Sequence, residues 1–436
     1  MAYRMYDLIE MKKHNIPLNE DEIRWMVGEY TAGRIPDYQI SAFLMAVWFQ
    51  GLSDEETSFL TMAMAESGEM MDLSAIPGTK LDKHSSGGIG DKTTLILGPV
   101  MSALGIPTAK MSGRGLGFTG GTVDKLESIP GLRSEFSLDE FLQVVKDVGF
   151  VEASQTKNLA PADKLLYALR DVTATVDSIP LIASSIMSKK IAAGADRIVL
   201  DVKCGSGAFM QELSSAKQLA ETMIRIGESV GRKTVAVISD MNQPLGRAVG
   251  NAIEVEEALE VLSGGGEERL RELVIRLAVE MLQLSDKAKA TDEEAREEVI
   301  RVLTDGSAKE RFFRYVERTG GNTDFQNSPS WKAAYQEPVY PKEAGYLYFC
   351  NASEVGLAAV LLGAGRDKKE DVIDPAAGIR ILKKLGDPVT PEEPIAILLT
   401  NKKDAIPAAK EKLLAAYSIS QDKPEVRPVV EEVLGK

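Results

Sequence analysis

Residues 80–127 read KLDKHSSGGIGDKTTLILGPVMSALGIPTAKMSGRGLGFTGGTVDKLE. Within them, two short apolar segments each lead into a glycine-rich loop that also carries hydroxyl side chains. Glycine allows a chain to turn its N–H groups inward and to approach an anion closely. These residues therefore predict a phosphate site built largely from backbone donors.

The two loops have the same plan. The first, residues 83–90, combines Lys83, His84 and two serines with three glycines. A helix is expected to begin near Lys92, so its N-terminal dipole and free N–H groups face the same anion. The second loop, residues 112–122, contains five glycines. Two such loops at the ends of neighbouring strands predict one shared anion pocket.

Two common nucleotide-binding motifs fit these loops less well. Residues 115–120 match the G-x-G-x-x-G dinucleotide fingerprint, but another glycine, a threonine and Pro130 follow instead of a long helix. The first loop resembles a Walker A loop, yet Asp91 stands where a glycine should precede Lys92, and a carboxylate there would repel nucleotide phosphates. Tight structural turns would explain either loop alone, whereas the two together favour anion binding.

The composition is that of an ordinary globular protein large enough for two or three domains. The 436 residues include 51 basic and 65 acidic side chains, a net charge of −14, which argues against nucleic acid as a partner. Cys204 and Cys350 lie far apart without metal-ligand spacing, which predicts reduced thiols and a cytoplasmic location. The longest uncharged run, residues 93–109, is too short for a membrane span, so no membrane partner is expected.

The order of patterns along the chain predicts an α/β fold with additions at both ends. Residues 1–66 read as helices, with N-cap signals at Asn19 and Ser53. Their apolar stripe of Ile40, Phe43, Leu44, Val47 and Trp48 fits a core or a subunit interface. Strand-length runs at 80–83, 108–111, 197–203 and 234–238 alternate with helices, which predicts a mostly parallel sheet. Residues 160–193 are helical, with a break at 177–180.

The C-terminal part reads differently. Its first portion, about residues 290–340, is mostly helical, and the chain then becomes rich in strands and turns. Residues 386–396 resemble the hairpins of biotinyl and lipoyl carrier domains, but no exposed turn offers a lysine for attachment. We therefore predict a structural, barrel-sandwich-like appendage.

Three sequences are similar to the signature of the thymidine and pyrimidine nucleoside phosphorylases. They are Lys83-His84-Ser85 with the following GGIGD, the segment SGRGLG-x-TGGT-x-DKLESIPG at 112–131, and TATVDSIPLIASSIMSKKIA at 173–192. The resemblance implies phosphorolysis of pyrimidine nucleosides without an organic cofactor. It also implies a homodimer formed through the helical domain, and a substrate cleft between that domain and the α/β domain.

The resemblance, together with the patterns above, gives three parts. A small all-helical domain for dimerisation and base binding comprises 1–66 plus 160–193. A large α/β domain with a mostly parallel central sheet, which binds phosphate, comprises 80–154 plus 197–335. A C-terminal α+β subdomain comprises 336–436. Closure of the cleft is expected to hinge at 66–79, 155–162 and 194–196.

The resemblance also assigns roles to individual residues. The positions that match phosphate contacts are Lys83, Ser85, Thr94, Lys110, Met111, Ser112 and Thr122. Arg170, Ser185 and Lys189 match the residues that bind the pyrimidine, and Arg170 and Lys189 with His84 form the expected catalytic set. Ser185 and Lys189 are four residues apart and share a helix face, a spacing that also fits a solvated polar face. His84 is expected to act on the pyrimidine O2 as an acid or hydrogen-bond donor.

Two positions depart from the family pattern. Related Gram-positive enzymes hold potassium at the positions of Gly90, Lys92, Leu245, Ala248 and Glu257, which implies potassium here. Lys92 replaces the usual threonine, so the alternative is that its own ammonium stands beside Glu257. Phe118 replaces a common histidine near the sugar or base, which affects substrate preference rather than the phosphate loops.

Two other functions remain as alternatives. A phosphoribosyltransferase of the same architecture would need an acidic motif for magnesium diphosphate, which the sequence does not display, and would have no use for Arg170 and Lys189. A non-catalytic pyrimidine or phosphate binder would retain the same donors without turnover.

Overall fold

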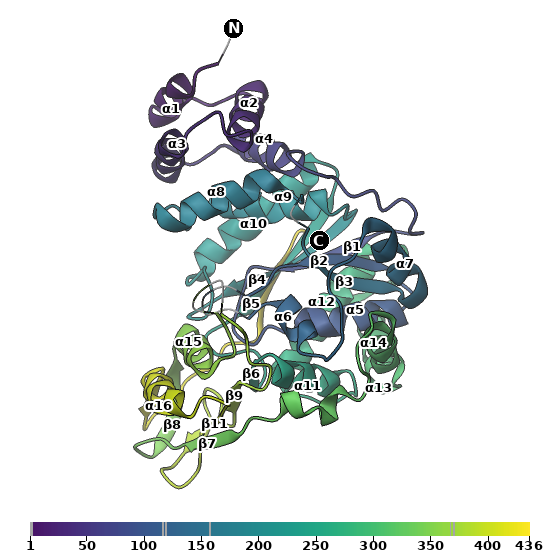
Figure 1. The fold of residues 1–436 in the computed structure, drawn as a ribbon, viewed down its shortest axis with the longest axis vertical. Helices are drawn as coiled ribbons and strands as arrows, with labels where there is room; N and C mark the ends of the chain where they lie inside the picture. Colours follow the sequence, from purple (N-terminus) through teal and green to yellow (C-terminus); the bar gives the residue numbers. More distant parts are fainter. Residues whose placement is uncertain (1–2, 116, 118–119, 157, 367, 369–370) are drawn as a thin grey trace.

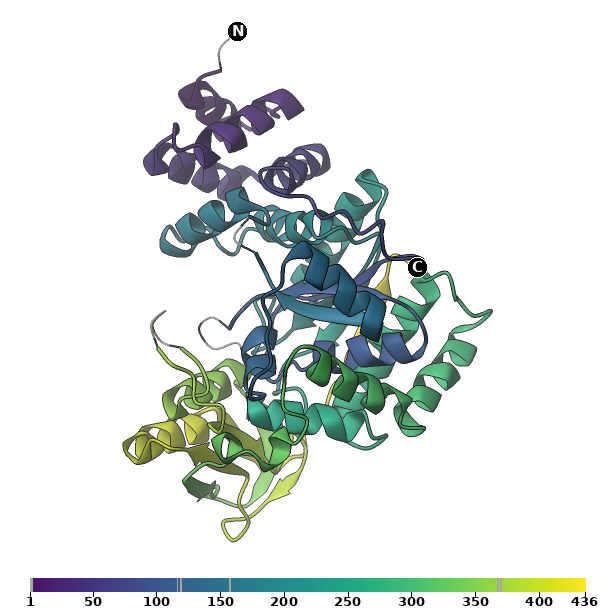
Figure 2. The same ribbon diagram turned by 45° about the vertical axis from the view of Figure 1, so that its right-hand side comes forward.

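The computed structural model describes residues 3–115, 117, 120–156, 158–366, 368 and 371–436. A helical domain stands at one end of the molecule and a β-rich C-terminal domain at the other, with an α/β domain between them (Figures 1 and 2). The predicted fold class is confirmed. Among the described residues, no helix combines the length and the apolar character that crossing a membrane requires.

The helical domain is assembled from two separate parts of the chain. Asn19 and Ser53 are the predicted N-caps, and each accepts a hydrogen bond from the backbone N–H of a glutamate three residues later in a capping box. Four residues of the predicted stripe are buried in the core of this domain, whereas Trp48 is 42% exposed. The helices are α1 (Met5–Lys13), α2 (Glu20–Thr31), α3 (Asp37–Gln50), α4 (Asp54–Ala65), α8 (Pro161–Val172) and α9 (Ile179–Ala192).

The central sheet has six strands in the order β13-β5-β4-β1-β2-β3. Five strands are parallel, and β13 pairs with β5 in the antiparallel direction. The strands are β1 (Leu81–Ser85), β2 (Thr108–Ser112), β3 (Phe150–Ser154), β4 (Arg197–Cys204), β5 (Lys233–Asp240) and β13 (Val430–Leu434). The strand β13 is a correction to the predicted division, because the end of the chain leaves the C-terminal part and returns to this sheet (Figure 1).

Helices cover both faces of the sheet. On the side toward the helical domain, α10 (Leu213–Ser229) packs on β4 and β5, and α9 packs on α10 (Figure 1). On the other side, α12 (Glu268–Leu284) and α5 (Thr93–Ala103) contact the strands and each other. The remaining elements of this domain are α6 (Thr122–Glu127), α7 (Leu138–Val148), α11 (Ala252–Val261), α13 (Asp292–Thr304), α14 (Ser307–Arg318), η1 (Phe325–Asn327) and η2 (Pro329–Trp331).

The C-terminal domain consists of two small antiparallel sheets and two helices, in agreement with the predicted β-rich part. One sheet has the order β6-β9-β11-β7 and the other β10-β8-β12. The elements are β6 (Ala248–Gly250), β7 (Tyr335–Val339), β8 (Gly345–Cys350), α15 (Ala352–Leu362), β9 (Gly378–Ile381), β10 (Pro388–Val389), β11 (Ala396–Thr400), η3 (Lys403–Ala405), α16 (Ile406–Ala415) and β12 (Tyr417–Ser420).

The segments that join the helical domain to the sheet lie against one another. The backbone N–H of Glu69 donates to the Asn158 carbonyl at 3.0 Å, and that of Met71 donates to the Ala192 carbonyl at 2.8 Å. A Cβ atom at Gly68 would lie 2.0 Å from the Asn158 carbonyl oxygen, so only glycine allows this approach. These hydrogen bonds hold the connecting segments together, beside the packing of α9 and α4 on α10.

Candidate active site

A cavity opens where the parallel strands β1 and β2 end. Carboxyl ends of parallel strands meet at one edge of a sheet, and ligands of open α/β sheets bind there. Six of the seven predicted phosphate contacts line this cavity together with His84; they are Ser85, Thr94, Lys110, Met111, Ser112 and Thr122. The structure therefore brings the two glycine-rich loops together around one space, as the sequence predicts.

Lys83 is the predicted phosphate contact that does not line this cavity. Its side chain is buried, with Nζ donating to Thr93 Oγ1 at 2.6 Å and lying 3.1 Å from Asp201. In this arrangement Lys83 supports the first turn of α5 and contributes positive charge near the cavity. Direct contact with phosphate stays a prediction for this residue.

A connected group of charged side chains adjoins the cavity. Lys110 Nζ donates to the Lys83 carbonyl at 2.6 Å and thereby joins two clusters, one around Asp82 and one around Asp201. The group comprises four lysines (Lys83, Lys110, Lys190 and Lys203) and three aspartates (Asp82, Asp91 and Asp201). The excess of positive charge attracts an anion to the neighbouring cavity.

Burial and neighbouring charge shift the acid–base behaviour of this group. Burial alone would raise the pKa of Asp91, but the ammonium groups of Lys203 and Lys83 hold it well below its usual range. Burial lowers the pKa of Lys190 to about 8. On the neighbouring strand β3, burial raises the pKa of Glu152 to about 7. Near neutral pH, Glu152 therefore cancels only part of the positive charge beside the cavity.

His84 lies at the rim of this cavity as a neutral imidazole. Burial lowers its pKa well below 6.5, and the positive charges of Lys190, Lys110, Lys189 and Lys83 lower it further. A neutral imidazole still carries one N–H donor. Of the two predicted roles, hydrogen-bond donation therefore fits the surroundings of His84 better than proton transfer from an imidazolium.

The predicted base-binding residues lie on α8 and α9, outside the lining of the phosphate cavity. Lys189 Nζ lies 3.1 Å from Ser185 Oγ and 2.7 Å from Asp163 Oδ2. The buried Arg170 guanidinium donates to the carbonyls of Thr175, Val176 and Leu181, which leaves two of its five N–H groups for other acceptors. The positive charge of Lys189 is near enough to His84 to contribute to the lowering of its pKa.

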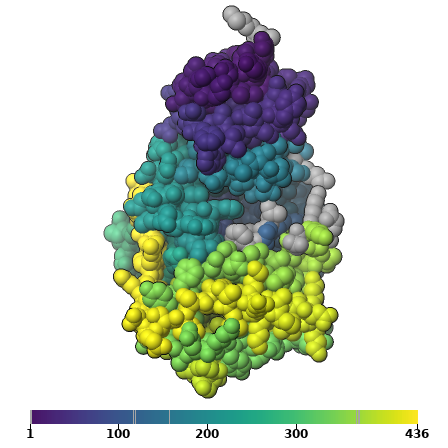
Figure 3. Space-filling model, turned by 90° about the vertical axis from the view of Figure 1, so that its left-hand side faces the viewer, coloured from purple at the N-terminus to yellow at the C-terminus, as the bar shows by residue number. Residues whose placement is uncertain are grey.

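A hollow separates the helical end of the molecule from its C-terminal end (Figure 3). The helices α8 and α9 lie between the rest of the helical domain and the central sheet (Figure 1).

Sequence reasoning missed several charged residues of this region. Asp163 lies seven residues before Arg170, two helical turns earlier on the same face of α8, and pairs with Lys189. Asp201 and Lys203 are buried charges in strand β4, whose residues 198–200 are all apolar. Charged side chains at alternate positions of a buried strand are a recognisable signal for a paired site.

The five residues of the predicted potassium site also come together. Lys92 Nζ donates to the carbonyls of Leu245 at 3.0 Å and Ala248 at 2.9 Å, and lies 2.5 Å from Glu257 Oε2. The donor set of carbonyl oxygens and one carboxylate suits a monovalent cation, but the Lys92 ammonium already uses it. Phe118, the other departure from the family pattern, lies outside the described residues.

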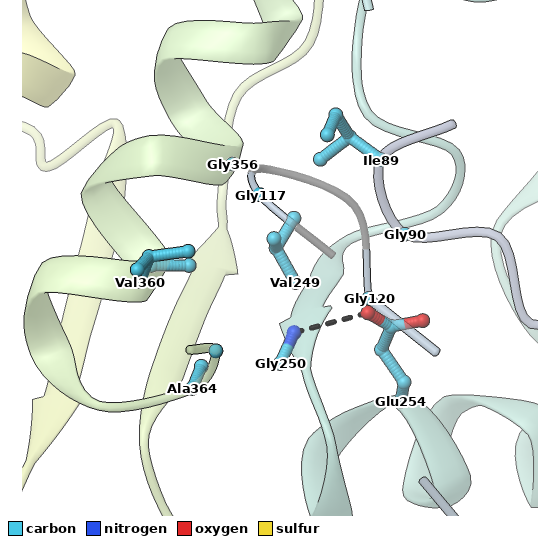
Figure 4. A pocket seen from close by; sticks show the side chains of 12 residues that line it. Ile89, Gly90, Gly117, Gly120, Val249, Gly250, Glu254, Gly356, Val360 and Ala364 are labelled. Atoms are coloured by element: carbon cyan, nitrogen blue, oxygen red, sulfur yellow. Dashed lines mark hydrogen bonds between the residues drawn. The ribbon is translucent and has the colours of Figure 1, made fainter. Parts of the chain in front are cut away.

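A second, small cavity lies beside the two glycine loops, close to Lys92 and its partners. It is lined by Ile89 and Gly90, by Gly117 and Gly120 of the second loop, and by residues of β6 and α15 (Figure 4). Within it the Gly250 N–H donates to Glu254 at 3.0 Å. The C-terminal domain therefore closes the back of both loops through α15.

Comparison with known protein families covers most of the chain. Residues 6–68 match the helical bundle domain of a glycosyl transferase family, and residues 78–309 match the a/b domain of that family. Residues 346–420 match the pyrimidine nucleoside phosphorylase C-terminal domain. The order of these matches follows the order of the three structural parts.

Individual relatives agree with these matches. The pyrimidine-nucleoside phosphorylase of Bacillus subtilis is 55% identical over 403 residues, covering 92% of this chain and 93% of the relative. That of Geobacillus stearothermophilus is 52% identical and covers 96% of both chains. The crystal structure of anthranilate phosphoribosyltransferase from Thermus thermophilus superposes with a TM-score of 0.58 at 19% identity, covering 72% of this chain and 99% of the other, which indicates a shared fold. The chain belongs to the pyrimidine-nucleoside phosphorylase family.

Proposed function

We propose that this protein catalyses the reversible phosphorolysis of pyrimidine nucleosides such as uridine, thymidine and deoxyuridine. The products are the free base and α-D-ribose 1-phosphate or its deoxy counterpart. The observation that carries the proposal is the cavity between the two glycine loops, which is lined by His84 and by six of the predicted phosphate contacts. The names of the relatives support the same reaction.

In the proposed reaction, a phosphate oxygen forms a bond to C1′ of the sugar as the bond from C1′ to the pyrimidine nitrogen breaks. The bonding electrons leave with the base, which then takes up a proton. Ser85, Ser112 and Thr122 would hold the phosphate beneath the sugar, where its position replaces a random encounter. The positive charge behind the cavity lets the phosphate remain ionised.

The departing base needs stabilisation of its growing negative charge. The neutral His84 N–H would donate to the pyrimidine O2, and Arg170 and Lys189 would supply positive charge to the ring oxygens. Closure at the junction of residues 66–79, 155–162 and 194–196 would bring these groups to the phosphate and exclude water. No organic cofactor enters this scheme.

The groups that would hold the substrate also distinguish this proposal from a phosphoribosyltransferase. Such an enzyme would hold a diphosphate through magnesium, which is bound by one or two carboxylates together with the diphosphate itself. The cationic side chains on α8 and α9 suit an electron-rich pyrimidine leaving group.

We further propose that the protein is a cytoplasmic homodimer. Large apolar side chains are exposed on α3 and α8, two helices that contact each other; they are Tyr38, Trp48, Phe49, Leu165 and Val172. Such a patch is typical of a subunit interface. The two free cysteines, both buried, suit a reducing compartment.

The test of the reaction is base release followed by ultraviolet absorbance at alkaline pH. Purified protein is incubated with uridine or thymidine, with and without phosphate. We expect release that depends on phosphate, and the ratio of the two rates assigns the preferred sugar and base. Binding of nucleoside by the folded protein without any release would support the non-catalytic alternative.

A further inference from the structure

The side chain of Lys92 ends in a closed cage of oxygen atoms. Its ammonium donates to two backbone carbonyls, those of Leu245 and Ala248, and pairs with the Glu257 carboxylate. Lys92 is fully buried and Glu257 is 5% exposed, so water does not replace these partners. The cage therefore joins the first glycine loop to the segment before β6 and to α11.

The charge of the cage is balanced by one cation. Burial alone would raise the pKa of Glu257, but Lys92 and the backbone N–H groups of Arg247 and Ala248 hold it below its usual range. The carboxylate is thus ionised, and the two carbonyls add only dipoles. One carboxylate compensates one positive charge, which the ammonium already provides.

The cage is closely packed on the side of Gly90, and its charge disfavours a second cation. A Cβ atom on Gly90 would lie 2.6 Å from the Leu245 carbonyl oxygen and 3.0 Å from that of Ala248. A free ion sharing these oxygens would stand within about 4 Å of the ammonium, where like charges in a protein interior repel strongly.

Two further buried lysines donate to backbone carbonyls near the cage, one in the segment before β6 and one next to Lys92. Lys384 Nζ donates to the carbonyls of Pro244 at 2.6 Å and Gly246 at 2.8 Å. Lys125 Nζ donates to the Asp91 carbonyl at 2.8 Å and pairs with Glu254. Both residues are buried. The two glycine loops and the 244–248 segment are therefore held together by ammonium groups of this chain.

We propose that the Lys92 ammonium is a tethered cation that takes the place of a free potassium ion, so that the phosphate site assembles without a monovalent metal. Lys92 acts as a positioning residue. It directly precedes α5, whose Thr93 bonds to Lys83 and whose Thr94 lines the phosphate cavity. The inference about the reaction rests on the proposed function, whereas the inference about the cage concerns folding alone.

The experiment compares the apparent unfolding temperature and the phosphate KM in chloride salts of potassium, sodium and choline at equal ionic strength. We expect the wild-type protein to give the same values in all three. A wild-type unfolding temperature that rises specifically with potassium overturns the proposal.

Two variants separate an empty cage from a filled one. Lys92→Thr removes the ammonium and leaves space with a hydroxyl, and Lys92→Met fills much of the same space with an apolar chain. We expect both to unfold about 5 °C or more below the wild type in choline, because each leaves Glu257 unpaired. Potassium should restore the unfolding temperature of Lys92→Thr in a saturable way, lower its phosphate KM by about tenfold, and leave Lys92→Met unchanged.

A Lys92→Thr protein that unfolds at the same temperature in all three salts contradicts the proposal. The unfolding temperatures do not depend on turnover. If they follow the expected pattern while no base is released, the proposed reaction fails and the tethered cation stands.

Discussion

His84 combines a position at the phosphate cavity with a lowered pKa, and this decides how it can act. Because its pKa is well below 6.5, the imidazole of His84 stays neutral at pH values where an ordinary histidine is already protonated. A neutral donor stabilises charge on the leaving base without giving up its proton. The activity that depends on His84 should therefore persist as the pH falls through 6.5, the ordinary value for histidine.

Replacing His84 by alanine should lower kcat by about 10²-fold, the usual cost of losing one donor to a developing charge, with little change in phosphate KM. His84→Gln keeps an N–H donor and should recover part of the loss. Steady-state kinetics from pH 5 to 8 measure both effects. An unchanged kcat in His84→Ala, or an acid limb near pH 6.5 that His84→Gln removes, would rule out this role.

The site residues that could be predicted from sequence are those whose partners are close in the chain. Ser85, Ser112 and Thr122 belong to two recognisable loops, and the structure places them around one cavity. From the sequence, Asp91 is interpreted only as a carboxylate that would repel nucleotide phosphates. In the structure Asp91 pairs with Lys203, which lies on β4. In the neighbouring cluster, Lys190 pairs with Asp82 across 108 residues of chain. Pairings of this kind leave no local pattern.

Among the elements, strand β3 carries a buried carboxyl group that responds to pH. Burial raises the pKa of Glu152 in the folded protein to about 7 from an ordinary value of 4.5. Between these values the folded protein holds a proton that the unfolded chain releases. Glu152 therefore makes the folded state less stable as the pH rises through that window.

A glutamine at position 152 cannot ionise, so the Glu152→Gln variant should not lose stability in this way as the pH rises. We expect its free energy of unfolding, relative to the wild type, to increase between about pH 5 and pH 7. Urea unfolding of both proteins across this range measures the difference, and subtraction removes the opposite contribution of His84. A difference that stays constant with pH would show that Glu152 is already ionised in the folded protein.

Strands with strong local patterns were predictable, and two others were not. The structure places β1, β2, β4 and β5 within a few residues of the expected runs. The short β3 carries Glu152 in its middle, which interrupts its apolar pattern. The strand β13 pairs with β5, far earlier in the chain, and its sequence VEEVL gives no sign of that partner. Register between distant segments is a tertiary property.

At the scale of the whole molecule, the helical domain forms one end (Figure 2), and large apolar side chains are exposed on its helices α3 and α8. Phe49 is 72% exposed at the end of α3, and its ring packs edge-on against Trp48. Trp48 Nε1 in turn donates to Asp177 at 2.8 Å, which ties α3 to the segment before α9. A partner subunit on this surface would therefore press on the helices that carry the predicted base-binding residues.

Phe49→Asp should shift the protein toward the monomer, because a carboxylate in an apolar interface loses its hydration. Tyr340→Asp, on an exposed position of the C-terminal domain, is the control and should leave the dimer intact. Sedimentation velocity at several protein concentrations distinguishes the species. Equal dimer formation by both variants would place the interface elsewhere.

The measurement that tests the central claim most directly is the rate of base release from uridine and thymidine as phosphate is titrated. The two glycine loops form a phosphate site, so we predict no release without phosphate and a rate that saturates as phosphate is added. Release that proceeds equally well without phosphate, or no release at any phosphate concentration from folded protein, would contradict this account.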